Sequence, residues 1–461
     1  MSQFNQQLIS IVGADHFLTE KSDRENYAQD WSRLYQPDPL AIVRPASTGE
    51  VVAIVKLCNQ FEVAIVPSGG RTGLSGGACA TQKELVVSLD RLNKIIDFNP
   101  VDQTVNCGAG VITQQLQDFA RDQGLYYPVD FASAGSSQIG GNIATNAGGI
   151  KVLKYGLTRD WVAGLTIVTA SGEIIELNKG LVKNATGYDL RHLMIGSEGT
   201  LGIITAASMK LTDPPKDPTV MLLALEKLDD VSNLLTHFRS SMDLMAFEFF
   251  SQAALEKVLE HRSLKPPFND AADYYVLIEF ECAAESDLDK ALSAFELAAE
   301  NGWLLDGIIS QSQQQAEELW QYREGISESI AHYPPYKNDI AVMPSRVGEF
   351  LTEVDHFVCK NYPEFENIWF GHIGDGNLHL NILRPESMPL EKFKSTCASA
   401  NPEIFSILQK FEGSISAEHG VGLLKRDYLH YSRSSAELEL MRAIKTAFDP
   451  KNLLNPGKLF K

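Results

Sequence analysis

The stretch AIVPSGGRTGLSGGA, Ala64–Ala78, decides the fold of the amino-terminal half of the chain. Before it, AIVRP from Ala41 is a short apolar strand, and a helix capped by Thr48 would bury Val51 and Val55. The predicted order is therefore strand, helix, strand, and the loop that follows has five glycines in eleven residues. We expect its backbone N–H groups to lie against a bulky anion such as a diphosphate, with a flexible surface linker as the alternative.

Further glycine-rich stretches follow. In TVNCGAGVITQQLQDFARDQG, a strand meets Gly108 to Gly110, but Thr113 stands where a dinucleotide fingerprint needs its third glycine, so we predict a tight strand-to-helix turn. SAGSSQIGGNIATNAGG, residues 133–149, follows an apolar segment and predicts a second ligand-binding surface rather than a linker. A hairpin with its turn at Ser171 and Gly172 comes next, and then another glycine turn at residues 196–202.

A proline-rich boundary, TDPPKDP, spans residues 212–218. Beyond it, VMLLALE, LMAFEFF and YYVLIEFE are predicted strands separated by helical stretches, which favours an α+β domain with an antiparallel sheet backed by helices. The expected organisation is a helical lead over residues 1–40, a ligand-binding domain over 41–217, a second domain over 218–430 and a carboxy-terminal segment over 431–461.

Three histidines and a carboxylate gather in GHIGDGNLHLNI, which starts at Gly371, and in SAEHGVG, which starts at Ser416. Two imidazoles and a carboxylate are a common catalytic ligand set for zinc, with manganese as the second choice. The predicted ligands are His372, His379 and Glu418, and His419 would be available to move a proton. Taken alone, these two stretches fit a zinc hydrolase as well as an oxidoreductase, and a polar loop without metal is the remaining alternative.

Composition excludes some classes of function. At 461 residues the chain should hold at least two domains, and its net charge of −19 argues against nucleic acid as a partner. Its six cysteines include no CxxC pair, which predicts reduced thiols. Neither a secretory signal nor an apolar run of spanning length is present, so we expect a cytoplasmic protein, or one peripheral to the inner membrane.

The order of these pieces resembles the flavin-dependent oxidoreductases of the vanillyl-alcohol oxidase type, in the branch of the D-2-hydroxyacid dehydrogenases. PSGGRTGLSGGA is similar to that family's pyrophosphate loop, GSSQIGGNIATNAGG to its second FAD segment and GSEGTLGI to its third. GHIGDGNLHLNI, SAEHGVG and FDPKNLLNPGK resemble its carboxy-terminal signatures. The resemblance runs from Tyr27 to the end of the chain, and it implies a PCMH-type FAD-binding domain of two α+β subdomains, an α+β substrate domain and a capping carboxy-terminal segment.

The resemblance also implies which residues bind FAD. No histidine occurs in the glycine-rich loop or the second segment, so we expect a non-covalent flavin. The predicted cofactor-binding residues are Pro67, Ser68, Gly69, Gly70, Arg71, Thr72, Gly73, Leu74, Ser75, Gly76, Gly135, Ser136, Gly140, Gly141, Asn142, Thr145, Asn146, Gly148, Gly149, Glu198, Gly199, Gly202, Ile203 and Asn455.

Within the branch, the chain is most similar to the D-2-hydroxyglutarate dehydrogenases. By that resemblance Arg323, Ser327, Lys337, Asn381 and His419 bind substrate, and His419 is the general base in the oxidation of a D-2-hydroxyacid. A guanidinium and an ammonium suit a dicarboxylate such as D-2-hydroxyglutarate. D-lactate, glycolate and D-malate are alternative substrates, and an FAD electron-transfer subunit is a less favoured alternative. The implied partners are an electron acceptor such as electron-transfer flavoprotein or quinone, rather than NAD, and a second copy of the chain in a homodimer.

Overall fold

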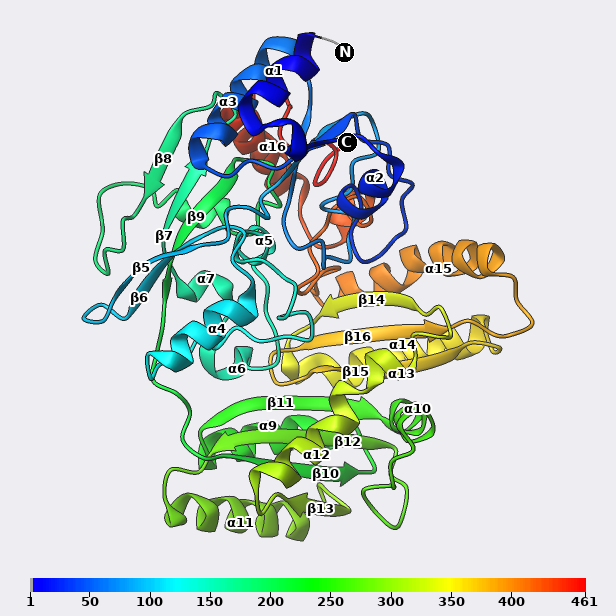
Figure 1. Cartoon of the computed structure of the whole chain (residues 1–461). Helices are drawn as coiled ribbons and strands as arrows, with labels where there is room; N and C mark the ends of the chain where they lie inside the picture. The colour runs from blue at the N-terminus through cyan, green and yellow to red at the C-terminus, as the bar shows by residue number, and fades with distance from the viewer. Residues whose placement is uncertain (1–2) are drawn as a thin grey trace. The chain divides into compact units, whose positions relative to one another are not determined.

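The computed structural model describes residues 3–461, which form two compact units (Figure 1). Unit 1 contains the described residues up to Gly149, then Gly156–Pro214 and Glu418–Lys461. Unit 2 contains Ile150–Tyr155 and Pro215–Ala417. The chain therefore passes between the units four times, and the carboxy-terminal segment belongs to the same unit as the glycine-rich loops.

The first sheet of unit 1 is built from the predicted strand, helix, strand unit. Its order is β1-β2-β4-β3, with β2, β4 and β3 parallel and β1 antiparallel to β2. The helix between β2 and β3 is capped by Ser47, whose hydroxyl accepts from Glu50 N at 3.2 Å, so the prediction of Thr48 as the cap is wrong by one residue. The elements are β1 (Phe17–Leu18), β2 (Ala41–Val43), α3 (Thr48–Phe61), β3 (Ile65–Ser68) and β4 (Leu85–Ser88).

The second sheet of unit 1 is antiparallel, in the order β5-β6-β9-β7-β8. The predicted hairpin turn is confirmed: Gly172, between β7 and β8, has φ +79°, a conformation that glycine adopts at little cost. Between the end of β6 and α4, a Cβ on Gly108 would lie 2.0 Å from the carbonyl oxygen of Leu92, so this glycine serves close backbone packing in the predicted tight turn. The elements are β5 (Ile95–Asn99), β6 (Thr104–Gly108), α4 (Thr113–Asp122), β7 (Val162–Val168), β8 (Ile174–Leu177) and β9 (Ile203–Lys210).

The carboxy-terminal segment of unit 1 pairs with the first residue of β3. Ile65 N donates to Leu453 O at 2.7 Å, and Asn455 N donates to Ile65 O at the same distance. Helix α16 (Ser435–Phe448) contributes Ile444 and Phe448 to the core of this unit. The remaining unit 1 helices are α1 (Gln3–Val12), α2 (Lys21–Tyr27), α5 (Ile139–Thr145), α7 (Thr158–Trp161) and α8 (Arg191–Met194), with 3-10 turns at Ala14–His16 and Arg426–Tyr431.

Unit 2 is a seven-stranded antiparallel sheet backed by helices, as predicted. The strand order is β13-β10-β12-β11-β15-β16-β14, so β14 is an edge strand (Figure 1). Helices α10, α12 and α13 share a hydrophobic cluster with the sheet, and α14 packs on both α9 and α15. The strands are β10 (Pro218–Leu225), β11 (Leu244–Ser251), β12 (Tyr274–Glu281), β13 (Asp306–Ile309), β14 (Tyr336–Ala341), β15 (Glu366–His372) and β16 (Asn377–Leu383). The helices are α6 (Val152–Tyr155), α9 (Asp229–Ser241), α10 (Gln252–Arg262), α11 (Glu285–Glu300), α12 (Gln313–Glu324), α13 (Ile326–Ser329), α14 (Val347–Asn361) and α15 (Leu390–Lys410), with a 3-10 turn at Pro344–Arg346.

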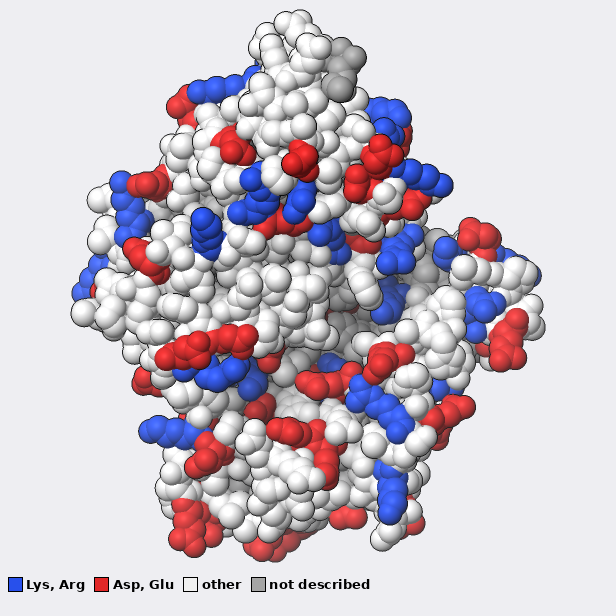
Figure 2. Space-filling view, in the orientation of Figure 1, with Lys and Arg blue, Asp and Glu red and all other residues white. Residues whose placement is uncertain are grey.

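Charges are mixed on the surface. On the face drawn in Figure 2, Lys and Arg side chains alternate with Asp and Glu rather than forming one basic field. This distribution agrees with the negative net charge and gives nucleic acid no extended basic surface on that face. Among residues 3–461, no helix combines the length and the apolar composition that crossing a membrane requires.

Candidate functional site

In unit 1 the glycine-rich loop after β3 lies against the second glycine-rich segment. A Cβ on Gly70 would stand 2.2 Å from the carbonyl oxygen of Ser136, so only glycine permits this approach. The Arg71 side chain donates to Gly69 O at 2.7 Å, pairs with Asp90 at 3.3 Å and lies 4.7 Å from the Tyr27 ring centroid. Its guanidinium is therefore held by contacts within unit 1.

Buried polar atoms without a protein partner mark the edges of this loop. Ser68 Oγ, Gln138 Oε1 and Asn455 Oδ1 have no hydrogen-bond partner among the described residues. All three residues are less than 10% exposed. A buried polar group normally finds a partner, so these orphaned atoms fit a polar ligand along the loop. Gln138 was not among the predicted residues. Its place directly before α5, inside the second glycine-rich segment, could have indicated it as a ligand-binding residue.

Several residues of the second segment have structural contacts within unit 1. Gly140 N donates to Ala109 O at 2.8 Å, and the side chain of Asn142 donates to Thr113 Oγ1 at 2.7 Å. Gly149 has φ +127° and would place a Cβ 2.0 Å from Asp130 O. These contacts fix the shape of the segment.

The third segment binds the carboxy-terminal stretch through Glu198. This buried carboxylate accepts from Val421 N at 2.8 Å and from Gly422 N at 2.9 Å, and Asn455 Nδ2 donates to its backbone oxygen. Burial raises the pKa of Glu198 to about 7, although the two backbone hydrogen bonds and Lys425 act in the opposite direction. The Glu198 side chain thus holds the loop that follows His419.

In unit 2 the strand register places the predicted site on one face of the sheet. Residues opposite one another in antiparallel strands share a face, as do residues two apart along a strand. Phe250 of β11 faces Phe370 of β15, which faces His379 of β16, which in turn faces Asp339 of β14. Glu248, His372 and Asn381 each stand two residues from one of these along its own strand, and Lys337 faces Asn381, so all four share that face. We call it the polar face of the sheet.

The two histidines lie close together within unit 2. The ring centroids of His372 and His379 are 5.4 Å apart, and their planes are nearly perpendicular at 85°. Asp339, which is 1% exposed, lies 3.7 Å from His379 Nδ1 and accepts a hydrogen bond from Asn377 Nδ2 at 2.8 Å. Sequence reasoning missed Asp339 because a single aspartate in a strand carries no metal-ligand spacing.

Glu248 is the second carboxylate that the sequence did not reveal. Its Oε1 lies 2.8 Å from His372 Nδ1, and its Oε2 lies 2.8 Å from Arg323 Nη2. Arg323 is 6% exposed and also lies over the Phe370 ring, 4.8 Å from its centroid. The Arg323 Nε has no hydrogen-bond partner among the described residues.

The other predicted substrate residues differ in exposure. Asn381 is 2% exposed and directly faces Lys337, whose side chain is exposed on edge strand β14. Ser327 is exposed on α13, whereas Ser329 is fully buried and its Oγ has no partner among the described residues.

Glu418 and His419 open the last stretch of unit 1. The Nε2 atom of His419 and the Oε1 atom of Glu418 are 3.9 Å apart, and both side chains are about one-fifth exposed. The preceding residue, Ala417, ends unit 2, and its backbone N–H donates to Asp339 Oδ2 at 3.1 Å. Consecutive Cα atoms are about 3.8 Å apart, so chain connectivity alone keeps Glu418 next to the end of unit 2.

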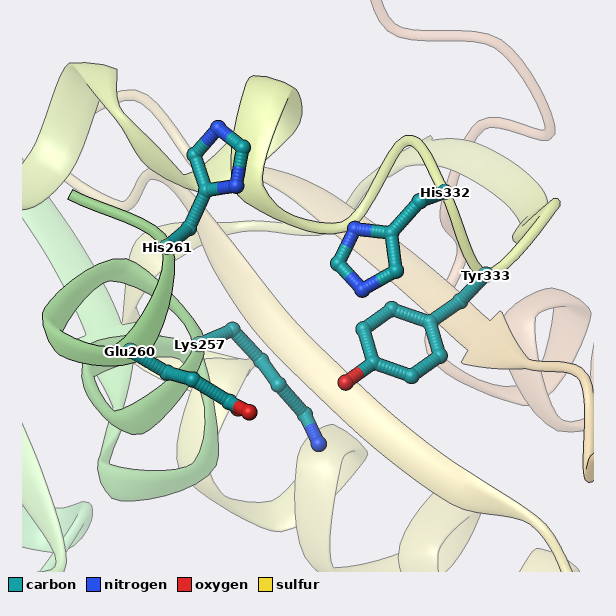
Figure 3. Close-up of a pocket in the computed structure, with 5 residues that line it drawn as sticks. All are labelled: Lys257, Glu260, His261, His332 and Tyr333. Carbon is teal, nitrogen blue, oxygen red and sulfur yellow. The ribbon is translucent and has the colours of Figure 1, made fainter.

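A pocket of about 290 Å³ lies elsewhere in unit 2 (Figure 3). The Lys257 ammonium in this pocket is already paired with Glu366 at 3.0 Å. The side chains that line it come from α10 and from the loop after α13, and they are Lys257, Glu260, His261, His332 and Tyr333. None of these is a predicted site residue.

Two family models match this chain. The family model described as an FAD binding domain matches residues 39–178, and the model described as the C-terminal domain of FAD linked oxidases matches residues 214–459. D-2-hydroxyglutarate dehydrogenases of Stutzerimonas stutzeri and Xanthomonas citri are each 54% identical over 454 residues, which is 98% of this chain and 98% and 96% of theirs. A D-2-hydroxyglutarate–pyruvate transhydrogenase of Saccharomyces cerevisiae is 34% identical and covers 97% of this chain and 92% of its own.

Solved structures support the fold. Alkyldihydroxyacetonephosphate synthase superposes with a TM-score of 0.75 at 20% identity, covering 99% of this chain and 86% of that one. A p-cresol methylhydroxylase gives 0.78 at 16% identity, covering 99% and 96%. The predicted α+β fold of the vanillyl-alcohol oxidase type is therefore confirmed. The chain belongs to the FAD-linked oxidase family and is a flavin-dependent oxidoreductase.

Proposed function

We propose that this protein oxidises D-2-hydroxyglutarate to 2-oxoglutarate, with FAD as the hydride acceptor. The observation that carries the proposal is Arg323, a buried guanidinium with one N–H group left without a partner among the described residues. Leaving a buried donor unpaired costs about 1–3 kcal/mol, and a substrate carboxylate would remove that cost. Relatives at 54% identity carry the name of this activity, and a dicarboxylate suits a site that offers Arg323 and Lys337.

FAD would be held without a covalent bond by unit 1. The three orphaned polar atoms of Ser68, Gln138 and Asn455 support this, as does the close approach of the glycine-rich loop to the second segment. Neither segment contains a histidine that could link to the flavin. A protein that binds FAD in this way should release it on denaturation.

A divalent cation fits the donor set of the polar face. Because a carboxylate only accepts hydrogen bonds, Glu248 keeps the proton of His372 on Nδ1 and leaves Nε2 as the atom that binds metal. His379 would be the second ligand, and Glu418 the third because it follows Ala417 directly. Zinc is the first expectation and manganese the second.

When bound, FAD supplies the hydride acceptor, and the cation supplies a Lewis acid that lowers the pKa of the substrate hydroxyl. Arg323 and the Ser327 hydroxyl would hold one carboxylate of the substrate, and Asn381 with Lys337 would hold the other. His419 would take the hydroxyl proton as the hydride leaves C2. The side chains of the protein would thus orient C2 of the substrate and accept the hydroxyl proton.

Anaerobic mixing of the flavoprotein with a panel of hydroxyacids tests the substrate. We expect D-2-hydroxyglutarate to bleach the flavin faster than D-malate, D-lactate or glycolate, and the L-enantiomers to leave it oxidised. Faster bleaching by D-lactate would identify a monocarboxylate oxidase on the same scaffold. After treatment with a chelator the protein should stay yellow but lose flavin reduction, and full activity without metal would contradict the metal role.

The reduced flavin needs an electron acceptor, for which we propose electron-transfer flavoprotein or quinone. The yeast transhydrogenase gives a 2-oxoacid as a second candidate, because its name pairs D-2-hydroxyglutarate with pyruvate. Stopped-flow reoxidation with each acceptor distinguishes them. All six cysteines are free thiols within the described chain, which supports a cytoplasmic site. A homodimer is the proposed assembly, and light scattering after size exclusion would test it.

A further inference from the structure

Glu248 contacts two of the predicted site residues in unit 2, one through each carboxylate oxygen. The two side chains that it contacts come from different elements, His372 from the end of β15 and Arg323 from α12. The contacts are 2.8 Å on each side, one from each carboxylate oxygen. Glu248 itself is 1% exposed and lies in the middle of β11, where all eight residues are buried.

The contact with His372 fixes which ring nitrogen is available. An ionised carboxylate has no proton to donate, so Nδ1 of His372 must carry the proton in this bond. The lone pair is then on Nε2, and the ring cannot rotate without breaking the contact. In metal sites, a carboxylate on the far nitrogen of a histidine ligand typically contributes about 10- to 100-fold in metal affinity.

The contact with Arg323 pairs two opposite charges inside unit 2. The side chains of Arg323 and Glu248 are 8% and 1% exposed. Either charge alone would be costly to bury, and the pair also holds the guanidinium in one place. Arg323 Nη2 lies 2.8 Å from Glu248 Oε2 as an ion pair, while the buried Nε of Arg323 has no hydrogen-bond partner among the described residues.

We infer that Glu248 is a positioning residue that couples metal binding to substrate binding: one oxygen orients His372, and the other orients Arg323. The inference deepens the proposed function and rests on it. It assigns no contact between Glu248 and the substrate, the flavin or the metal itself. A change at Glu248 should therefore alter how firmly the metal is held, and not only whether the enzyme turns over.

The test compares Glu248→Gln and Glu248→Leu with Glu279→Gln in the FAD-loaded protein. Glu279 is a matched control, because it is 5% exposed and lies on the same face of the same sheet, opposite Ala246 of β11. Its carboxylate pairs with Lys151 at 3.5 Å. Zinc affinity is measured by competition with a chromophoric chelator, and the ligand-field bands of the cobalt-substituted protein report the orientation of the histidines.

We expect zinc affinity to fall about 10-fold in Glu248→Gln and on the order of 100-fold in Glu248→Leu, with the cobalt bands shifted. Glu279→Gln should keep wild-type affinity, and all variants should keep their flavin, which is bound by the other unit. If Glu248→Leu does not fold, the isosteric Gln variant still decides. Wild-type affinity and bands in Glu248→Gln, or an equal loss in Glu279→Gln, would overturn the inference alone. A wild-type protein that takes up no zinc, manganese or cobalt would overturn it together with the metal part of the proposed function.

Discussion

The carboxylate of Asp339 accepts a hydrogen bond at 3.1 Å from the backbone N–H of Ala417, the residue directly before Glu418. The same carboxylate is bound by Asn377 on its other oxygen. One buried aspartate of β14 thus fixes the backbone at the point where the proposed third metal ligand begins. This relationship makes Asp339 a residue to test even though it is outside the predicted ligand set.

We predict that Asp339→Asn lowers turnover and metal content about 10- to 100-fold, because an amide has a single accepting oxygen for the two donors, Ala417 N–H and Asn377 Nδ2, and has no charge to offer His379. Metal per flavin, measured by mass spectrometry, checks the result. Asp355→Asn is the matched control: Asp355 is a partly buried aspartate that also accepts two hydrogen bonds, from Trp369 Nε1 and Asn367 Nδ2, but it is not among the proposed site residues. An unchanged metal content in Asp339→Asn would argue against this role.

The substitution Arg323→Lys tests the substrate site without leaving Glu248 unpaired. Lysine keeps the positive charge but lacks the planar set of donors, so it cannot bind Glu248 and a carboxylate in the same way. We expect kcat/KM for D-2-hydroxyglutarate to fall about 10- to 100-fold, and to fall less for D-lactate, which has a single carboxylate. Arg262→Lys, at a pair with exposed Glu328, should change neither value. Equal losses for both substrates would contradict the assignment of Arg323 to the carboxylate that D-lactate lacks.

The variant His419→Ala separates proton transfer from metal binding. Flavin reduction by the hydroxyacid should become at least about 100-fold slower, because the hydroxyl proton has lost its acceptor. Metal content should remain at the wild-type level. His430→Ala, an exposed histidine of the same unit, is the control. If His419→Ala loses its metal instead, His419 is a ligand rather than the base.

Glu198 should give the stability of the protein a distinct pH dependence. Its folded-state pKa of about 7 lies above the ordinary value of 4.5, so the folded protein holds this proton more tightly than the unfolded chain does. The stabilisation is fully present below about pH 4.5 and is lost as the pH rises through about 7. We expect Tm to decline from pH 5 to pH 8, and the decline to flatten in Glu198→Gln.

The control for this experiment is Glu437→Gln. Hydrogen bonds from Ser434 hold the pKa of Glu437 below its usual range, so its contribution is lost only as the pH falls through that lower value. The slope of Tm between pH 5 and pH 8 should therefore be the same in Glu437→Gln as in the wild type. A Glu198→Gln variant with the wild-type slope would show that other groups set the pH dependence.

Elements that depend on residues close together in the chain could be predicted from the sequence alone. Glycine loops after strands, the hairpin turn at Gly172, the tight turn at Gly108 and the antiparallel style of the second half were all readable, because each depends on residues close together in the chain. The histidine and glutamate clusters were visible for the same reason. Together with the resemblance, these signals gave the fold class and the flavin.

The tertiary structure was needed to show which side chains contact one another when they are far apart in the sequence. His372 and Glu248 are 124 residues apart, and Glu198 binds a loop more than 220 residues away. No local pattern selects Glu248 or Asp339 from 59 acidic residues. Their selection follows from the strand register of the unit 2 sheet, since a slip of one residue would turn each of these side chains to the opposite face.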